Sequence, residues 1–201
     1  MRSQPLRSKL LRTLPVLLLL ALPAQAPTWA QEVTLALPPD APEDLRTVLR
    51  NASLTLSLES EGLTAAQDVV AAARADYRRL LTGLYAEGYY GGTVSITVDG
   101  REAEAIQPFD APATVARVVL SVDPGPRFAF GGVALGPLAD DTVLPEGFAT
   151  GEVARSETIR EAVRVAVEAW REDGHARAAI ASQEVVADQP DARLDVAVAI
   201  D

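Results

Sequence analysis

Residues 81–92, LTGLYAEGYYGG, have the pattern of a long helix that ends at a glycine. Residues 167–178, VEAWREDGHARA, have the same pattern, and Gly174 lies 86 residues after Gly88. Glycine adopts the left-handed conformation that closes a last helical turn without a Cβ clash. We therefore interpret Gly88 and Gly174 as structural helix stops.

The strands that follow these helices also repeat. A strand with alternating apolar residues is predicted at residues 92–99, and a weaker one at 180–186. The last strand of each half matches residue for residue at a separation of 78. The matched positions are Val118, Leu120, Val122 and Asp123 in the first half and Val196, Val198, Ile200 and Asp201 in the second. This register indicates an internal repeat.

Each copy of the repeat reads as β-α-α-β-β, with a short opening strand at residues 32–37 and an interrupted one at 127–136. Gly131 and Gly132 indicate a β-bulge in the latter. The predicted fold class is α+β: two tandem units, each a three-stranded mixed sheet with two helices on one face. The stiff turn Pro124-Gly125-Pro126 places the units at residues 31–123 and 124–201.

The first 30 residues have the pattern of a secretory signal peptide. Four basic residues precede an apolar run, residues 14–22, that is too short to span a bilayer. Small residues up to Ala30 offer a cleavage site. The chain has no cysteine. An exported chain without disulfides is typical of the bacterial periplasm, where we expect this protein.

Charge and composition exclude several classes of function. The net charge is −10, and the first 30 residues carry four basic and no acidic residues, so residues 31–201 carry −14. Such an acidic surface argues against binding to nucleic acids or anionic lipids. The absence of cysteine excludes thiolate metal sites.

The sequence offers no residue set for catalysis. His175 is the only histidine, and no nucleophile motif accompanies it. The segment GYYGG follows a helix and lacks the order of a dinucleotide loop. We therefore expect no enzymatic activity, no cofactor and no metal. The alternative, a periplasmic enzyme or small-molecule binder, predicts a deep pocket between the units that converges on His175.

A binding function based on backbone chemistry remains. A three-stranded sheet leaves an open edge, whose unpaired N–H and C=O groups can pair with an extended segment. The strand after the first long helix contains no proline or lysine that would protect it from pairing. Its residues form the predicted partner-binding edge: Thr93, Val94, Ser95, Ile96, Thr97 and Val98. A proline at Ile96 should then abolish partner capture.

The repeat unit resembles a POTRA (polypeptide-transport-associated) domain. The resemblance rests on two features of the sequence. One is the helix that ends in Gly-Tyr-Tyr before a Val-x-Ile-x-Val strand, and the other is the segment ARVVLSVDPGPRFAFGGVALGPL at residues 116–138. That segment is similar to the junction between POTRA domains in TamA-type members of the BamA/TamA superfamily. The resemblance covers nearly all of residues 31–201.

The resemblance implies a non-enzymatic periplasmic arm of an outer-membrane assembly or translocation factor. Its partners would be a TamB-type inner-membrane-anchored protein and outer-membrane or autotransporter substrates. In the family, partner strands add to the second strand of a unit, which here corresponds to residues 92–99 and 177–186. The arm of a two-partner secretion transporter is the alternative. The family's C-terminal barrel is not in this sequence, which would make the chain either a fragment or a free-standing module.

Overall fold

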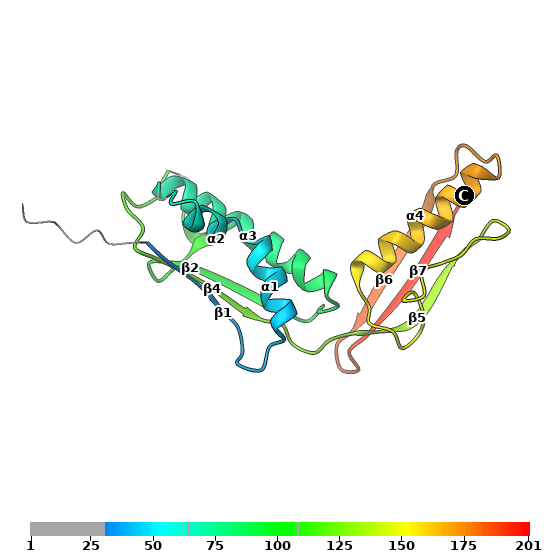
Figure 1. Ribbon diagram of the computed structural model, residues 1–201, viewed down its shortest axis with the longest axis horizontal. Helices are drawn as coiled ribbons and strands as arrows, with labels where there is room; N and C mark the ends of the chain where they lie inside the picture. Colours follow the sequence, from blue (N-terminus) through cyan, green and yellow to red (C-terminus); the bar gives the residue numbers. More distant parts are fainter. Residues whose placement is uncertain (1–30, 64, 108) are drawn as a thin grey trace, which may run out of the picture.

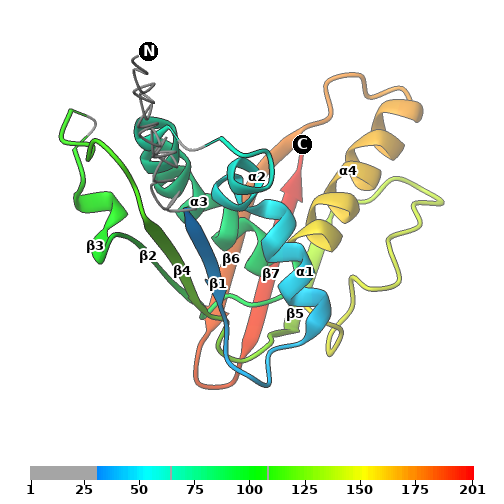
Figure 2. The ribbon, with the colours of Figure 1, turned by 60° about the vertical axis from the view of Figure 1, so that its left-hand side comes forward.

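The computed structural model describes residues 31–63, 65–107 and 109–201. The signal peptide predicted for residues 1–30 lies outside these ranges. Figure 1 shows two sheets side by side, each with its helices on one face, and Figure 2 shows the same arrangement from another side. The α+β class and the tandem arrangement predicted from the repeat are confirmed. No helix in the described ranges is long and apolar enough to cross a membrane.

The first sheet has the strand order β1-β4-β2-β3. Its strands are β1 (Glu32–Ala36), β2 (Thr93–Val98), β3 (Arg101–Glu102) and β4 (Arg117–Asp123). β1 runs parallel to β4, whereas β2 runs antiparallel to it. The mixed three-stranded sheet is as expected. The two-residue strand β3 is an addition, and it turns back along the outer side of β2.

Three helices and one 3₁₀ turn accompany this sheet, where the sequence predicted two helices. They are α1 (Glu43–Ala52), α2 (Leu54–Ser60), α3 (Ala66–Ala86) and η1 (Ala103–Ala105). The helical conformation is interrupted between α1 and α2 at Ser53. The hydroxyl of Ser53 donates a hydrogen bond to the buried carboxylate of Asp76 at 2.6 Å. Asp76 also accepts the N–H groups of Leu54 (2.8 Å) and Thr55 (3.0 Å). These three bonds satisfy the buried charge and fix α2 against α3.

The second sheet has the order β5-β7-β6. Its strands are β5 (Ala129–Gly136), β6 (Ile180–Asp188) and β7 (Arg193–Ile200). β5 runs parallel to β7 and β6 antiparallel to it, as in the first unit. The bulge predicted at Gly131 and Gly132 is confirmed by a register shift between Phe130 and Val133.

Only one helix, α4 (Ser156–Glu172), is found in the described part of the second unit, so the expected pair of helices is not formed there. Residues 137–155, which connect β5 to α4, run as turns and irregular chain where the sequence predicted a second helix. Pro137 and Pro145 lack the N–H that a helix needs, and Gly147 and Gly151 carry a high entropic cost in a helix. The second unit is therefore covered less completely than the first.

Each unit has its own apolar core. The first core joins the helices to the sheet through Leu45, Leu49, Val69, Leu80, Leu84, Ile96, Val98, Ile106, Val118 and Leu120. The second contains Phe128, Phe130, Phe148, Ile159, Val163, Leu194, Val196 and Val198. The boundary predicted near residue 123 falls between the last strand of one core and the first aromatic residue of the other.

The end of α3 forms the joint between the units. The carbonyl of Gly88 accepts a hydrogen bond from the N–H of Phe128 at 2.8 Å. The guanidinium of Arg127 lies 3.2 Å from the carboxylate of Glu87, and that of Arg155 lies 3.6 Å from it. The ring of Tyr90 meets that of Phe128 edge-on, with 5.7 Å between centroids. The segment GYYGG thus holds the second unit against the first.

Candidate protein-binding edges

The predicted partner edge, β2, is closed at its centre by side chains of its own unit. The N–H of Ile96 points away from β4 and donates to the hydroxyl of Tyr77 (3.2 Å) and to Glu102 Oε1 (3.1 Å). The Tyr77 hydroxyl also lies 3.1 Å from the Ile96 carbonyl and within hydrogen-bond distance of Glu102. The N–H of Ile96 is therefore occupied, and its carbonyl competes with Glu102 for the single hydroxyl hydrogen of Tyr77.

Glu102 stands at the end of β3 and completes this closure. Its second carboxylate oxygen accepts a hydrogen bond from the hydroxyl of Ser95 at 3.1 Å. β3 itself pairs with Thr97 and Val98. We call Tyr77 and Glu102 together the latch of β2, because an incoming strand must displace both side chains to reach Ile96.

The two latch groups have shifted pKa values. Partial burial, together with the hydrogen bond to Glu102, raises the pKa of Tyr77 to about 12. The hydrogen bond from Tyr77 lowers the pKa of Glu102 below its ordinary value. A neutral phenol beside an ionised carboxylate is thus the favoured state of the latch around neutral pH.

The sequence analysis expected little protection along β2, and this expectation is wrong at its centre. The protection comes from a tyrosine 19 residues away on α3 and from a glutamate beyond a tight turn. The absence of proline and lysine therefore did not reveal it. The role of Thr93, Val94, Ser95, Ile96, Thr97 and Val98 in binding a partner stays a prediction.

The corresponding strand of the second unit, β6, is open. It lies at the edge of its sheet and pairs only with β7. All nine of its residues are exposed. Among the described residues, the side-chain hydrogen bonds near β6 end at Ala178 and at the Asp188 carboxylate, and none reaches the backbone of β6. The outward N–H and C=O groups of β6 face solvent along nine residues. In β2, which has six residues, β3 already pairs with Thr97 and Val98.

The helix-facing side of β6 is also uncovered. Strand register aligns Val185 with Val196 in the second unit and Val98 with Val118 in the first, so the two valines hold equivalent positions. Val98 is 1% exposed, whereas Val185 is 43% exposed. The position of the buried Ile96 is taken by Gln183, opposite Val198. The second unit thus leaves half-buried apolar surface beside an unpaired edge.

A groove of about 430 Å³ runs between α4 and β6. Its apolar floor comes from Ile159, Val163, Val167 and Ile180. Arg160, Arg164 and Arg171 stand along it, and the first two pair with glutamates of α4. A strand added to β6 would place every second side chain over this groove, because side chains alternate between the two faces of a sheet.

The sequence indicates that β6 is exposed whereas β2 is covered, but a search for regular strands does not detect this indication. Ser182, Gln183 and Glu184 interrupt the apolar series of β6, and such polar residues lower the predicted regularity of a strand. They also mark a strand that its own unit does not bury. A weak apolar pattern in one copy of a repeat, beside a strong pattern in the other, is the feature that points to an exposed edge.

Gly88 and Gly174 end the two long helices with the same geometry. Their φ angles are +86° and +97°. The N–H of the following residue bonds to the carbonyl five positions back, at 2.9 Å for both Tyr89 and His175. His175 therefore takes the place of Tyr89, as the repeat predicts.

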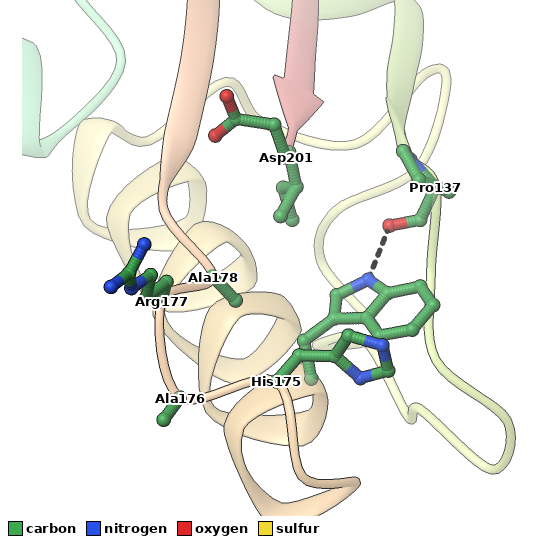
Figure 3. Close-up of a pocket in the computed structure, with 8 residues that line it drawn as sticks. Pro137, His175, Ala176, Arg177, Ala178 and Asp201 are labelled. Carbon is green, nitrogen blue, oxygen red and sulfur yellow. Dashed lines mark hydrogen bonds between the residues drawn. The ribbon is translucent and has the colours of Figure 1, made fainter.

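His175 lies at the surface beside Asp173. Its Nδ1 lies 3.7 Å from Asp173, and both side chains are 61% exposed. The residues that line the cavity beside it, among them Pro137 and Asp201, all belong to the second unit (Figure 3). No group of three or more potential metal-ligating side chains occurs among the described residues. The enzymatic alternative expected a pocket between the units, whereas the cavity that contains His175 is lined by the second unit.

Comparison with solved structures identifies the fold. The BamA POTRA3-5 structure of Haemophilus influenzae matches 85% of this chain with a TM-score of 0.50 and 13% sequence identity, and the match takes in 65% of that chain. The POTRA1-2 structure of Omp85 from Anabaena matches with a TM-score of 0.43, 14% identity, and coverage of 85% of this chain and 93% of that one. CdiB from Acinetobacter baumannii matches with a TM-score of 0.36 and 10% identity, over 86% and 29% of the two chains.

The first of these matches shows the class of fold: the chain folds like tandem POTRA domains. At such low identity the likeness concerns the fold alone. No protein-family model matches the sequence, and no curated protein matches it either. The finer resemblance to TamA-type proteins stays a prediction.

Proposed function

We propose that this protein is a periplasmic POTRA-type arm of an outer-membrane protein assembly or secretion system, and that it binds partner proteins by strand addition to β6. The observation that carries the proposal is the state of β6: a nine-residue edge strand, exposed throughout, beside an apolar groove. Main-chain hydrogen bonds would supply affinity for any extended segment, and the groove would select apolar side chains at alternate positions. The arm has no catalytic role in this proposal.

The partner in the TamA-like form of the proposal is a TamB-type inner-membrane-anchored protein. Outer-membrane proteins and autotransporters would be the substrates. β2 is a second, latched edge that would open only when Tyr77 and Glu102 are displaced. The proposal therefore ranks β6 before β2, although both correspond to the strand that the family resemblance assigns to partners.

Site-specific crosslinking tests this ranking, because the chain has no cysteine of its own. Single cysteines at Ser182 and Glu184 in β6, and at Ser95 and Thr97 in β2, would each carry a photoactivatable maleimide. Illumination with a purified periplasmic fragment of a TamB-type protein should crosslink the β6 positions several-fold more than the matched β2 positions.

Three outcomes would change the proposal. Crosslinks from β2 alone would keep strand addition but move it to the first unit. Crosslinks from neither strand, with binding intact, would exclude strand addition. Crosslinks from β6 to an exported substrate, without any to the TamB-type fragment, would favour the arm of a two-partner secretion transporter.

A further inference from the structure

The face of the second sheet that is turned away from α4 carries acidic side chains beside the open edge of β6 (Figure 1). Val196 of β7 belongs to the core, so its neighbours Asp195 and Ala197 project from this outer face, because side chains alternate along a strand. Strand register places Val186 of β6 opposite Asp195, and Glu184 opposite Ala197. Two carboxylates of neighbouring strands therefore lie on one face, next to the edge where a further strand would add.

A cavity of about 370 Å³ lies among these side chains. Its lining includes the carboxylates of Glu184 and Asp195 and the apolar side chains of Val186 and Ala197. Val186 is 51% exposed. Asp195 is held in place because its Oδ1 accepts the N–H of Gly132 at 2.5 Å. The cavity thus combines apolar surface with two carboxylates, which suit the aliphatic stem and the charged head of a lysine or arginine.

The first unit has different charges at the equivalent positions. Arg117 lies 78 residues before Asp195 and takes its place in the repeat. Strand register puts Thr97 where the second unit has Glu184. The guanidinium of Arg117 lies 2.9 Å from the carboxylate of Glu32 on β1. The first unit therefore carries a cation on this face and pairs it internally.

The two carboxylates of the second unit have no such internal partner. Among the described residues, no ion pair includes Glu184 or Asp195. Arg193 projects from the same face, but it stands opposite Asp188, next to the turn that joins β6 to β7. The negative charge at the middle of β6 is thus left uncompensated. A cation on an adjacent strand is the side chain that this charge favours.

The opposite face of β6 favours apolar side chains. The groove between α4 and β6 has an apolar floor, and Arg160 and Arg164 along it already pair with glutamates of α4. Successive side chains of an added strand point to opposite faces. One alternate set would therefore enter the groove, and the other would lie beside Glu184 and Val186.

We propose that the segment that adds to β6 is basic and amphipathic, with apolar side chains toward the groove and an arginine or lysine on the outer face. The stem of the basic residue packs on Val186 and Ala197, and its cation pairs with the carboxylates of Glu184 and Asp195. The inference rests on the proposed strand addition to β6. It adds the chemistry of the partner, which is an extended protein segment in which apolar and basic residues alternate.

Two synthetic peptides as long as β6 test this preference in the full chain. In one, valine and arginine alternate, and in the other glutamate replaces each arginine. Each carries a fluorophore, and binding is followed by anisotropy at physiological ionic strength, where long-range attraction to the acidic chain is screened. The arginine peptide should bind the parent chain about tenfold more tightly than the glutamate peptide.

Glu184→Arg and Glu104→Arg are a matched pair of variants. Each reverses the charge of one exposed glutamate, the first on β6 and the second on η1 of the first unit. Glu184→Arg should weaken binding of the arginine peptide about tenfold, whereas Glu104→Arg should change it less than about twofold. Equal affinity of Glu184→Arg and the parent chain for the arginine peptide would overturn the inference. A loss in Glu104→Arg alone would also overturn it, since the peptide would then lie on the first unit.

Strand addition itself is measured separately, with a photoactivatable maleimide on Ser182→Cys. If both peptides crosslink there and bind with equal affinity, the charge preference is wrong while strand addition to β6 stands. If neither peptide crosslinks at millimolar concentration, both the inference and the proposed strand addition are wrong. Concentration-dependent self-association that Glu184→Arg abolishes would assign the edge to a second copy of the chain instead of a basic partner.

Discussion

The two units share one topology but differ in how much of it is covered. In the first, three helices lie on the sheet, the latch closes the edge at Ile96, and the end of α3 is buried in the joint. In the second, a single helix lies on the sheet, β6 is exposed along its whole length, and the end of α4 is open. The comparison shows that two copies of one strand topology can differ in how much of their edge strand and helix end the rest of the unit covers.

The largest expected difference in the loss of stability is between substitutions of the equivalent valines, Val98 in β2 and Val185 in β6. Val98→Ala should lower the free energy of unfolding by about 2–3 kcal/mol, because it removes fully buried methyl groups and leaves a cavity. Val185→Ala should cost less than about 1 kcal/mol, because that side chain is already 43% exposed. Denaturant unfolding followed by circular dichroism measures both. Equal losses would mean that β6 is as well covered as β2.

Alanine substitutions of the two helix-ending glycines should show a smaller difference in the loss of stability than those of the two valines. Gly174→Ala should cost about 1 kcal/mol, the strain of a left-handed alanine in open space. Gly88→Ala should cost about 2 kcal/mol, because its Cβ would also approach Val153 to 2.9 Å. Thermal or denaturant unfolding of the two variants provides the measurement. A larger loss for Gly174→Ala would contradict the close fit of the joint.

Proline substitutions compare the two edges as binding surfaces. Of Glu184→Pro and Val185→Pro, one removes an outward N–H, and that variant should lower partner capture about tenfold, or about 1.4 kcal/mol. Ile96→Pro removes a donor that the latch already occupies, so capture should change less than about twofold while stability falls. A pull-down with the TamB-type fragment measures both effects. The opposite ranking would return the partner site to Thr93–Val98.

The smallest expected effect is the pH dependence of the latch. The hydrogen bond from Tyr77 holds the pKa of Glu102 below 4.5, its ordinary value. A depressed pKa in the folded state adds stability above the unfolded pKa, and this stability is lost as the pH falls through the folded pKa. Glu102→Gln should therefore be less stable than the parent at pH 7, by under about 1 kcal/mol, because Glu102 is partly exposed to solvent. The difference should shrink below pH 4.5 in acid titrations of the two proteins.

Local patterns in the sequence predicted most of the fold. Alternating apolar residues indicated β2, β4 and β7, and the repeat indicated a second unit with the same strand order. The bulge at Gly131 and Gly132 followed from glycine chemistry within one strand. Each of these features depends on residues that are close together in the chain, where periodicity and propensity act directly.

The remaining features depend on contacts between distant residues. Asp76 fixes the start of α2 from 22 residues away, and Tyr77 meets Ile96 across the unit. Nothing in the immediate neighbourhood of Ile96 marks its N–H as occupied. The second unit lacks a second helix because residues 137–155 contain prolines and glycines. The prediction gave more weight to the symmetry of the repeat than to these residues.

The open edge of β6 also has a consequence for the solubility of the protein. An exposed strand with Ile180 and Val186 at its surface is a template on which identical chains can pair edge to edge. Glu184 and Asp188 lie on the same strand, and residues 31–201 carry a net charge of −14. Repulsion between copies at short range opposes such pairing while it leaves the edge accessible to a partner that brings the opposite charge. The acidity of the chain thereby opposes self-assembly, and high salt would weaken this effect by screening the charges.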